Sequence, residues 1–399
     1  MMNKVNLIPK ITINKLLILI VYYTVIMQFF VTNAKFYSTL RIILMLAIVA
    51  LFLIVMLLNR GLYINKLLYL FIVISYISFI IGLILSVIFG NPIFELTILI
   101  PLIMMILGLN IKLSDRERQV LMYGYVLLTG ALGIYFVLKY GSGFVISAQY
   151  ILAQKNQIGS IIGISIVIIL YNLLVKRQHV FYNSLLLIVN LLPLLILRTR
   201  TIVIGVIVIF FYLLLKNIAF QIKNKRIFKL TIIIFGIIIL LTSNQVVSYF
   251  YDVFFLNVDT NDINSISSNR LESYIKSVPF ILEKFLFGEL IVNANNFDPH
   301  NFVLYTLQKK GLILSFSIIL IYFYFLIFML KNLVHSKLNK ISIPTLLLLL
   351  AFISSLFEYQ APFGPGTTQL ITWFFIGNSM RKGDFDEWKS EYNSSSTRV

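Results

Sequence analysis

The chain of 399 residues contains no cysteine and only three histidines. The absence of cysteine excludes a disulfide framework, a thiol nucleophile and a thiolate metal site. Charged residues are also scarce, at 12% of the chain, against roughly 25% in soluble globular proteins. Few of them, chiefly Glu95 and Glu358, lie within or beside the apolar runs. This shortage argues against a proton-coupled pump, which needs ionisable relays inside its membrane spans.

The sequence also lacks the short motifs that mark common cofactor sites. It has neither a His-Glu-x-x-His pair nor a glycine-rich loop ahead of Lys-Ser or Lys-Thr. We therefore expect no catalytic metal and no bound cofactor.

Apolar residues dominate what is present, at 59% of the chain. Many runs approach the roughly 20 residues that cross a bilayer as a helix, because the backbone must satisfy its own hydrogen bonds in lipid. The fold class predicted is an all-α, polytopic membrane helix bundle with about 12 transmembrane helices and one large external loop that contains short helices. The spans are expected near residues 14–32, 41–58, 67–89, 93–109, 120–138, 158–174, 181–197, 201–215, 230–242, 312–330, 341–357 and 367–380.

The lysines and arginines alternate between the segments that connect these spans. With the N-terminus inside, most of the 33 Lys and Arg residues fall in inside segments. This bias predicts that both termini are cytoplasmic and that the long polar segment is external. The net charge of +18 is thus interpreted as a topology signal that also attracts anionic membrane lipids, and not as nucleic-acid binding.

One long polar segment divides the chain. We expect membrane helices 1–9 in residues 1–241, an external loop subdomain in 242–311, membrane helices 10–12 in 312–380 and a flexible cytoplasmic tail in 381–399. A large loop that a membrane protein keeps outside the bilayer is a natural place for function.

Two helix starts are predicted in this loop. Asn269 followed by Glu272 fits a capping box, which would place Arg270 in the first turn of an amphipathic helix. The apolar side of that helix would consist of Leu271, Tyr274, Ile275 and Val278.

The second predicted start is Asp298-Pro299, with Asp298 as N-cap and Pro299 at the first helical position. His300 and Asn301 would follow in the first turn, and Gly311 would end this helix or link it to the next span.

These positions suit a particular chemistry. A helix N-terminus attracts anions, and the arginine fork is suited to phosphate. The same positive potential disfavours a protonated imidazole, so we expect His300 to stay neutral and able to accept a proton. An anion site beside a neutral base fits glycosyl transfer from a phosphate-linked donor. Taken singly, a loop arginine or a helix-start histidine is more often a solvated surface residue.

Five short segments form an ordered set of motifs along the chain. They are Lys155-Asn156-Gln157-Ile158-Gly159, Leu197-Arg198-Thr199-Arg200-Thr201, Asn269-Arg270-Leu271-Glu272-Ser273-Tyr274, Phe285-Leu286-Phe287-Gly288, and His300-Asn301 through Leu307 followed by Lys310-Gly311-Leu312. In this order the segments resemble motifs of one family, the superfamily of O-antigen polymerases (Wzy) and O-antigen ligases. Two departures are Thr199, where that family commonly has serine, and a missing second glycine after Gly288.

The resemblance implies a glycosyltransferase of the bacterial cytoplasmic membrane. Members use sugars linked to undecaprenyl pyrophosphate on the outer side of that membrane, without a metal or a nucleotide sugar. His300 would be the catalytic base that activates the acceptor hydroxyl, and Arg200 and Arg270 would bind the donor pyrophosphate. The expected partners are undecaprenyl-pyrophosphate-linked oligosaccharides, membrane lipids, a chain-length regulator and a flippase. Supporting residues would be Asn156, Arg198, Asn301 and Tyr305.

Three functions remain open at this point. The preferred one is a polymerase that joins repeat units into O-antigen or capsular polysaccharide. The first alternative is an O-antigen ligase, which transfers the polymer to lipid A core. The second is a non-enzymatic flippase for lipid-linked oligosaccharides, which would not need a large external loop with clustered arginine and histidine.

Overall fold

The computed structural model describes residues 10–59, 66–89, 96–140, 155–197, 199–221, 270–290, 298–336, 338, 341–364 and 367–381. Within these ranges every regular element is a helix. Seven helices of the described residues are long and apolar enough to cross a membrane, and four shorter apolar helices accompany them. The helical, multi-pass membrane class is thereby confirmed. The number twelve stays a prediction, because the expected span 230–242 lies outside the described residues.

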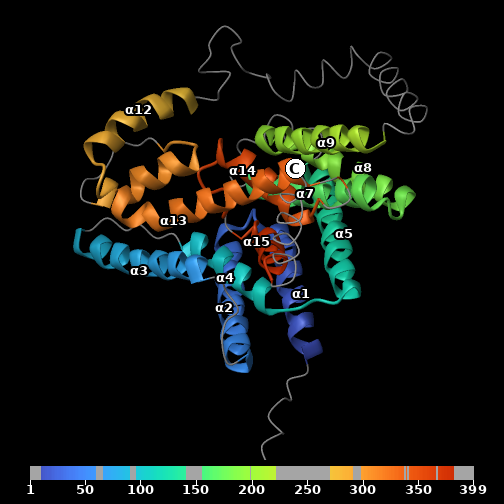
Figure 1. Cartoon of the computed structure of the whole chain (residues 1–399), viewed down its shortest axis with the longest axis horizontal. Coiled ribbons are helices and arrows are strands. Elements are labelled where there is room, and N and C mark those ends of the chain that lie inside the picture. The colour runs from blue at the N-terminus through green and yellow to red at the C-terminus, as the bar shows by residue number, and fades with distance from the viewer. Residues whose placement is uncertain are drawn as a thin grey trace, which may run out of the picture.

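Figure 1 shows the arrangement of the helices. Helices α3 and α13 run side by side along one flank, and α12 lies next to the start of α13. The elements are α1 (Lys10–Ile26), η1 (Met27–Phe30), α2 (Ala34–Asn59), α3 (Lys66–Phe89), α4 (Leu96–Asn110), α5 (Asp115–Tyr140), α7 (Lys155–Leu170), η3 (Tyr171–Lys176), α8 (Val180–Ile196), α9 (Arg200–Gln221), α12 (Arg270–Glu283), η4 (Gly288–Leu290), α13 (Phe302–His335), α14 (Ile343–Ser355) and α15 (Leu370–Ser379).

The outward faces of the peripheral helices are apolar. Leu57 in α2 is 81% exposed, and Ile80 in α3 is 56% exposed. A helix satisfies its own backbone hydrogen bonds, so such faces are stable against lipid although they would be costly in water.

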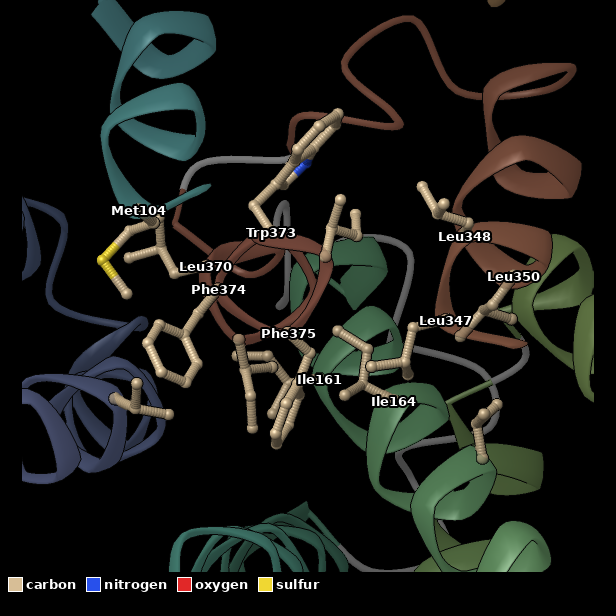
Figure 2. Close-up of a cluster of buried hydrophobic side chains, with 14 of the residues drawn as sticks. Met104, Ile161, Ile164, Leu347, Leu348, Leu350, Leu370, Trp373, Phe374 and Phe375 are labelled. Carbon is tan, nitrogen blue, oxygen red and sulfur yellow. The ribbon is translucent and has the colours of Figure 1, made fainter. Parts of the chain in front are cut away.

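The centre of the molecule is α15, which is only ten residues long. Its Trp373 and Phe374 are fully buried among side chains of α4, α7 and α14 (Figure 2). Helices α4 and α15 approach closely at two glycines, which have no side chain to keep them apart. A Cβ on Gly377 would lie 1.9 Å from the Met105 carbonyl oxygen, and one on Gly108 would lie 2.1 Å from the Phe374 carbonyl oxygen. Small residues permit such contact between membrane helices. A helix shorter than a bilayer span can therefore be fully buried inside protein.

The segment between α14 and α15 is held firmly by this core. The Trp373 Nε1 donates a hydrogen bond of 3.0 Å to the carbonyl oxygen of Pro362. Its ring stacks on Phe363, with centroids 4.7 Å apart and planes at 7°. The buried aromatic pair fixes the part of the connection that follows Glu358 and Tyr359.

Only part of the expected external loop is described. Helix α12 begins at Arg270, as predicted, although its expected cap Asn269 lies outside the described residues. The apolar side expected for α12 is mostly exposed, with Ile275 at 64%, whereas Ser277 and Ile281 face the protein. An amphipathic helix with an exposed apolar face suits a membrane interface.

Candidate functional site

The start of α13 differs from the prediction. Asn301, not Asp298, is the N-cap: its Oδ1 accepts hydrogen bonds from the amides of Val303 and Leu304 at 3.0 and 3.2 Å. Asp298 instead pairs with Lys309, Oδ1 to Nζ 2.9 Å. Pro299 is thus not at the first helical position, and His300 and Asn301 precede the first turn. Asp298 and Asn301, three residues apart, are both residues that commonly cap helices. Because Asp298 forms the ion pair with Lys309, Asn301 caps the helix.

Two helical stretches of α13 meet at Gly311, whose backbone is non-helical (φ 63°, ψ −180°), so this glycine links the loop helix to the next span, as predicted. The turn Phe285–Gly288, predicted from its sequence, packs directly on this junction. The Leu312 amide donates to the Phe285 carbonyl at 2.8 Å, and Gly288 and Gly311 both adopt positive φ, at +57° and +63°. Two motifs that are separated in sequence thereby make a backbone-to-backbone contact that orients the start of α13.

Gly311→Ala is expected to destabilise the protein strongly. A Cβ at this position would lie 2.3 Å from the Leu286 carbonyl oxygen, and the backbone at φ 63° and ψ −180°, a region adopted almost only by glycine, alone costs another residue roughly 1–3 kcal/mol. The thermal midpoint of the solubilised protein should fall well below that of the control Gly82→Ala, whose Cβ would touch only a Leu314 methyl at 3.3 Å. Equal midpoints for the two variants would contradict a close backbone contact at Gly311.

Arg270 reaches from α12 to the end of α14. Its Nη2 lies 3.1 Å from Oε1 of Glu358, and its Nη1 lies 3.5 Å from Oγ1 of Thr201. The same carboxylate oxygen accepts a hydrogen bond of 2.9 Å from Nδ2 of Asn156 at the start of α7. Four segments therefore meet at the Arg270–Glu358 pair: the starts of α7, α9 and α12, and the connection that follows α14.

The two other arginines of the expected site have different outcomes. Arg200 is the first residue of α9 and is partly exposed, next to the Thr201 that contacts Arg270. Arg198 lies outside the described residues. Thr199 is buried, and its Oγ1 has no hydrogen-bond partner among the described residues.

His300 lies just ahead of α13, beside this group. Its Nδ1 is buried without a hydrogen-bond partner among the described residues, an arrangement that costs free energy and is often found at functional sites. Burial lowers the pKa of His300, and the guanidinium of Arg270 lowers it further, against an opposing effect of Asp298. The expected direction is thereby confirmed, although its main cause is burial.

Tyr274 ties α12 to both neighbours of the site. Its hydroxyl lies 2.9 Å from the carbonyl oxygen of Leu356 and 3.3 Å from that of His300. Prediction had assigned Tyr274 only to an apolar face. Through these contacts the Tyr274 side chain instead links helix α12 to the backbone at His300 and Leu356.

An aromatic pair borders His300. The ring centroids of Tyr305 and Tyr359 lie 4.4 Å apart, and the centroid of the Tyr359 ring lies 6.3 Å from that of the His300 ring. Tyr305 is the supporting residue predicted from the sequence, whereas Tyr359 was not predicted. Flat aromatic surfaces with a hydroxyl edge suit the mixed apolar and polar surface of a sugar.

Glu358 is central to the electrostatics of the site. In the sequence it stood out only as one of the few acidic residues beside an apolar run. Burial raises the pKa of its carboxyl, while Arg270, Asn156 and Lys155 act in the opposite direction. The carboxylate holds Arg270 in place and partly neutralises it. An anionic ligand would therefore have to compete with Glu358 for the guanidinium.

The structure thus brings together Asn156, Arg270 and Glu358 by direct contact, with His300 and Tyr305 beside them. No family model, curated protein sequence or solved structure matches this chain. A function must consequently be argued from these residues and their geometry.

Proposed function

We propose that this protein is a membrane glycosyltransferase that polymerises oligosaccharide repeat units linked to undecaprenyl pyrophosphate. The product would be O-antigen or capsular polysaccharide, made on the outer side of the cytoplasmic membrane with both termini cytoplasmic. The observation that supports this proposal most is the guanidinium of Arg270, held at 3.1 Å from Glu358 beside a histidine whose pKa is lowered. A cation and a neutral base side by side are what transfer from a pyrophosphate-linked donor requires.

The proposed reaction uses three residues. His300 accepts the proton of the acceptor hydroxyl while its oxygen bonds to the anomeric carbon of the donor sugar. The bond from that carbon to the pyrophosphate oxygen breaks, and undecaprenyl pyrophosphate leaves as an anion. Arg270 and Arg200 stabilise the charge that grows on this leaving group.

The remaining side chains would position the substrates. Glu358 and Asn156 orient Arg270 before the donor binds, because the carboxylate contacts both of them. Asn301 fixes the start of α13 and so the backbone next to His300. Tyr305 and Tyr359 would face a sugar ring, and preorganisation of this kind reduces what must be ordered on binding.

Transfer of finished polymer to lipid A core by a ligase is the main alternative, because it needs the same donor chemistry. A flippase is less well supported, since translocation alone does not call for a neutral histidine beside a pyrophosphate-binding cation. Either alternative predicts a different glycan when the protein is missing.

Deletion of the gene from its native host is expected to leave surface glycan with single repeat units and no long chains. Without the polymerase, single repeat units are still exported and attached to the surface, but they are not joined to one another. Electrophoresis of the extracted surface glycan measures the chain lengths, and complementation with the intact gene is the control. Uncapped lipid A core with accumulated lipid-linked polymer would instead identify a ligase. Repeat units trapped on the cytoplasmic side would identify a flippase.

A further inference from the structure

A cavity with a partly polar lining lies at the other end of the helices that build the candidate site. It has a volume of about 440 Å³, within the range of small-molecule sites. Helix α7 with its extension η3 runs from Asn156 at the first site to Lys176 at this cavity, and at 1.5 Å per residue the two are about 30 Å apart. Helix α14 likewise begins at the cavity with Ile343 and leads to Glu358 at the first site. The cavity is therefore separate from the proposed glycosyltransferase centre.

The lining of this cavity is rich in hydrogen-bonding groups. Arg118 of α5 and Lys176 of η3 supply two cations, and Asp115 supplies the one carboxylate among the lining residues. The Nζ of Lys176 lies 5.9 Å from the centre of the Tyr171 ring, and Nη2 of Arg118 donates to Oδ1 of Asn378 at 3.3 Å. The amides Gln119, Asn172, Gln178 and Asn378 and the hydroxyls Ser342 and Ser379 complete the polar lining.

The local backbone at this cavity is irregular. Residues Tyr171–Lys176 form a π-helix, a geometry that occurs frequently at functional sites. The turn that follows places Arg177 and His179 at positive φ, 53° and 46°, with the lining residue Gln178 between them. The N-cap Ser342 of α14 makes no side-chain cap bond, so the positive end of that helix faces the cavity with its amides uncapped by a side chain. The start of α14 favours an anion, and the irregular backbone of η3 is typical of a functional site.

We propose that this cavity binds a phosphate group through Arg118, Lys176 and the start of α14. Arginine provides the fork that recognises phosphate, and lysine adds a second charge. The distribution of lysine and arginine predicts that this end is cytoplasmic. The phosphate could belong to an anionic phospholipid headgroup, for which basic pockets between membrane helices are suited, or to a soluble organic phosphate.

Two probes distinguish these sources in the full-length protein reconstituted in lipid nanodiscs. Cardiolipin retained from mixed nanodiscs is counted by native mass spectrometry, and inorganic pyrophosphate is titrated into nanodiscs of neutral phosphatidylcholine with thermal shift as the readout. The test variants are Arg118→Gln and Lys176→Gln. The matched controls are Arg116→Gln and Arg177→Gln, which remove the same charge from exposed neighbours that do not line the cavity.

At least one probe should bind about tenfold more weakly to each test variant than to its control, as expected for the loss of one charge-assisted contact. Weaker cardiolipin retention identifies a lipid headgroup, and weaker pyrophosphate binding identifies a soluble phosphate. Lys176 is exposed, so Lys176→Gln keeps the test valid if Arg118→Gln fails to fold. Equal binding to tests and controls, or no binding of either probe to the wild type, would overturn the proposal.

Discussion

His300→Ala is expected to lower the rate of glycosyl transfer by about 10² to 10⁴-fold, the usual contribution of a positioned general base. The variant should fold normally, because the imidazole Nδ1 makes no hydrogen bond among the described residues and Asn301 caps α13 without it. The measurement is the chain length of surface glycan in the deletion strain, at matched protein levels in the membrane. Long chains at the wild-type level would remove His300 from the mechanism.

The control for this variant is His335→Ala. His335 is the last residue of α13 and is exposed, and its Nδ1 lies 2.9 Å from the Lys331 carbonyl oxygen of its own helix. It should leave chain length unchanged.

The pH dependence provides a further check on the same residue. Because burial and Arg270 lower the pKa of His300, the ring stays neutral at pH values where an ordinary histidine is half protonated. In vitro activity should therefore persist down to a pH below about 6.5, the ordinary histidine value, and fall as the pH drops through the lowered pKa.

Arg270→Ala is expected to reduce activity by about 10- to 100-fold, since hydrogen bonds to a charged group contribute about 1.5–3 kcal/mol. The loss has a second cause. Without the guanidinium, buried Glu358 keeps the hydrogen bond from Asn156 and the influence of Lys155, but its pKa rises further because the principal lowering effect is gone. Arg270→Lys retains the charge without the fork, so its activity should lie between those of Arg270→Ala and the wild type.

Lys276→Ala is the matched control on the same helix. Its side chain is 55% exposed and pairs only with Glu272, so activity should not change. Glu358→Gln keeps the shape of the side chain while removing its charge. If Arg270→Ala and Lys276→Ala had equal activity, Arg270 could not be the donor-binding cation.

The sequence predicted the helices well because long apolar runs have few alternatives in lipid. Its limit appears at α15, which was expected as a membrane span at 367–380 but is a helix of only ten residues. That helix owes its stability to the protein packed around it, which no local pattern records. The choice between Asp298 and Asn301 as cap was also beyond local reasoning, because a distant charge, that of Lys309, decides it.

The candidate site was foreseen in part. Arg270, His300 and Asn156 were singled out from motif and chemistry, and they do lie in one region. Glu358 was not assigned to it, although its rarity as an acid beside an apolar run was the available signal. Its partners lie 88 and 202 residues away in sequence, so only the folded chain reveals that it joins them.

The stacking of Trp373 on Phe363 has a practical consequence. The chain contains two tryptophans, and the other, Trp388, can be replaced by phenylalanine to leave a single fluorophore. Trp373 is fully buried and hydrogen-bonded to the same connection that carries Glu358. Its emission would thus respond to movement of that connection when a donor competes for Arg270. If the proposed site binds a donor, this one native side chain would report its occupancy optically.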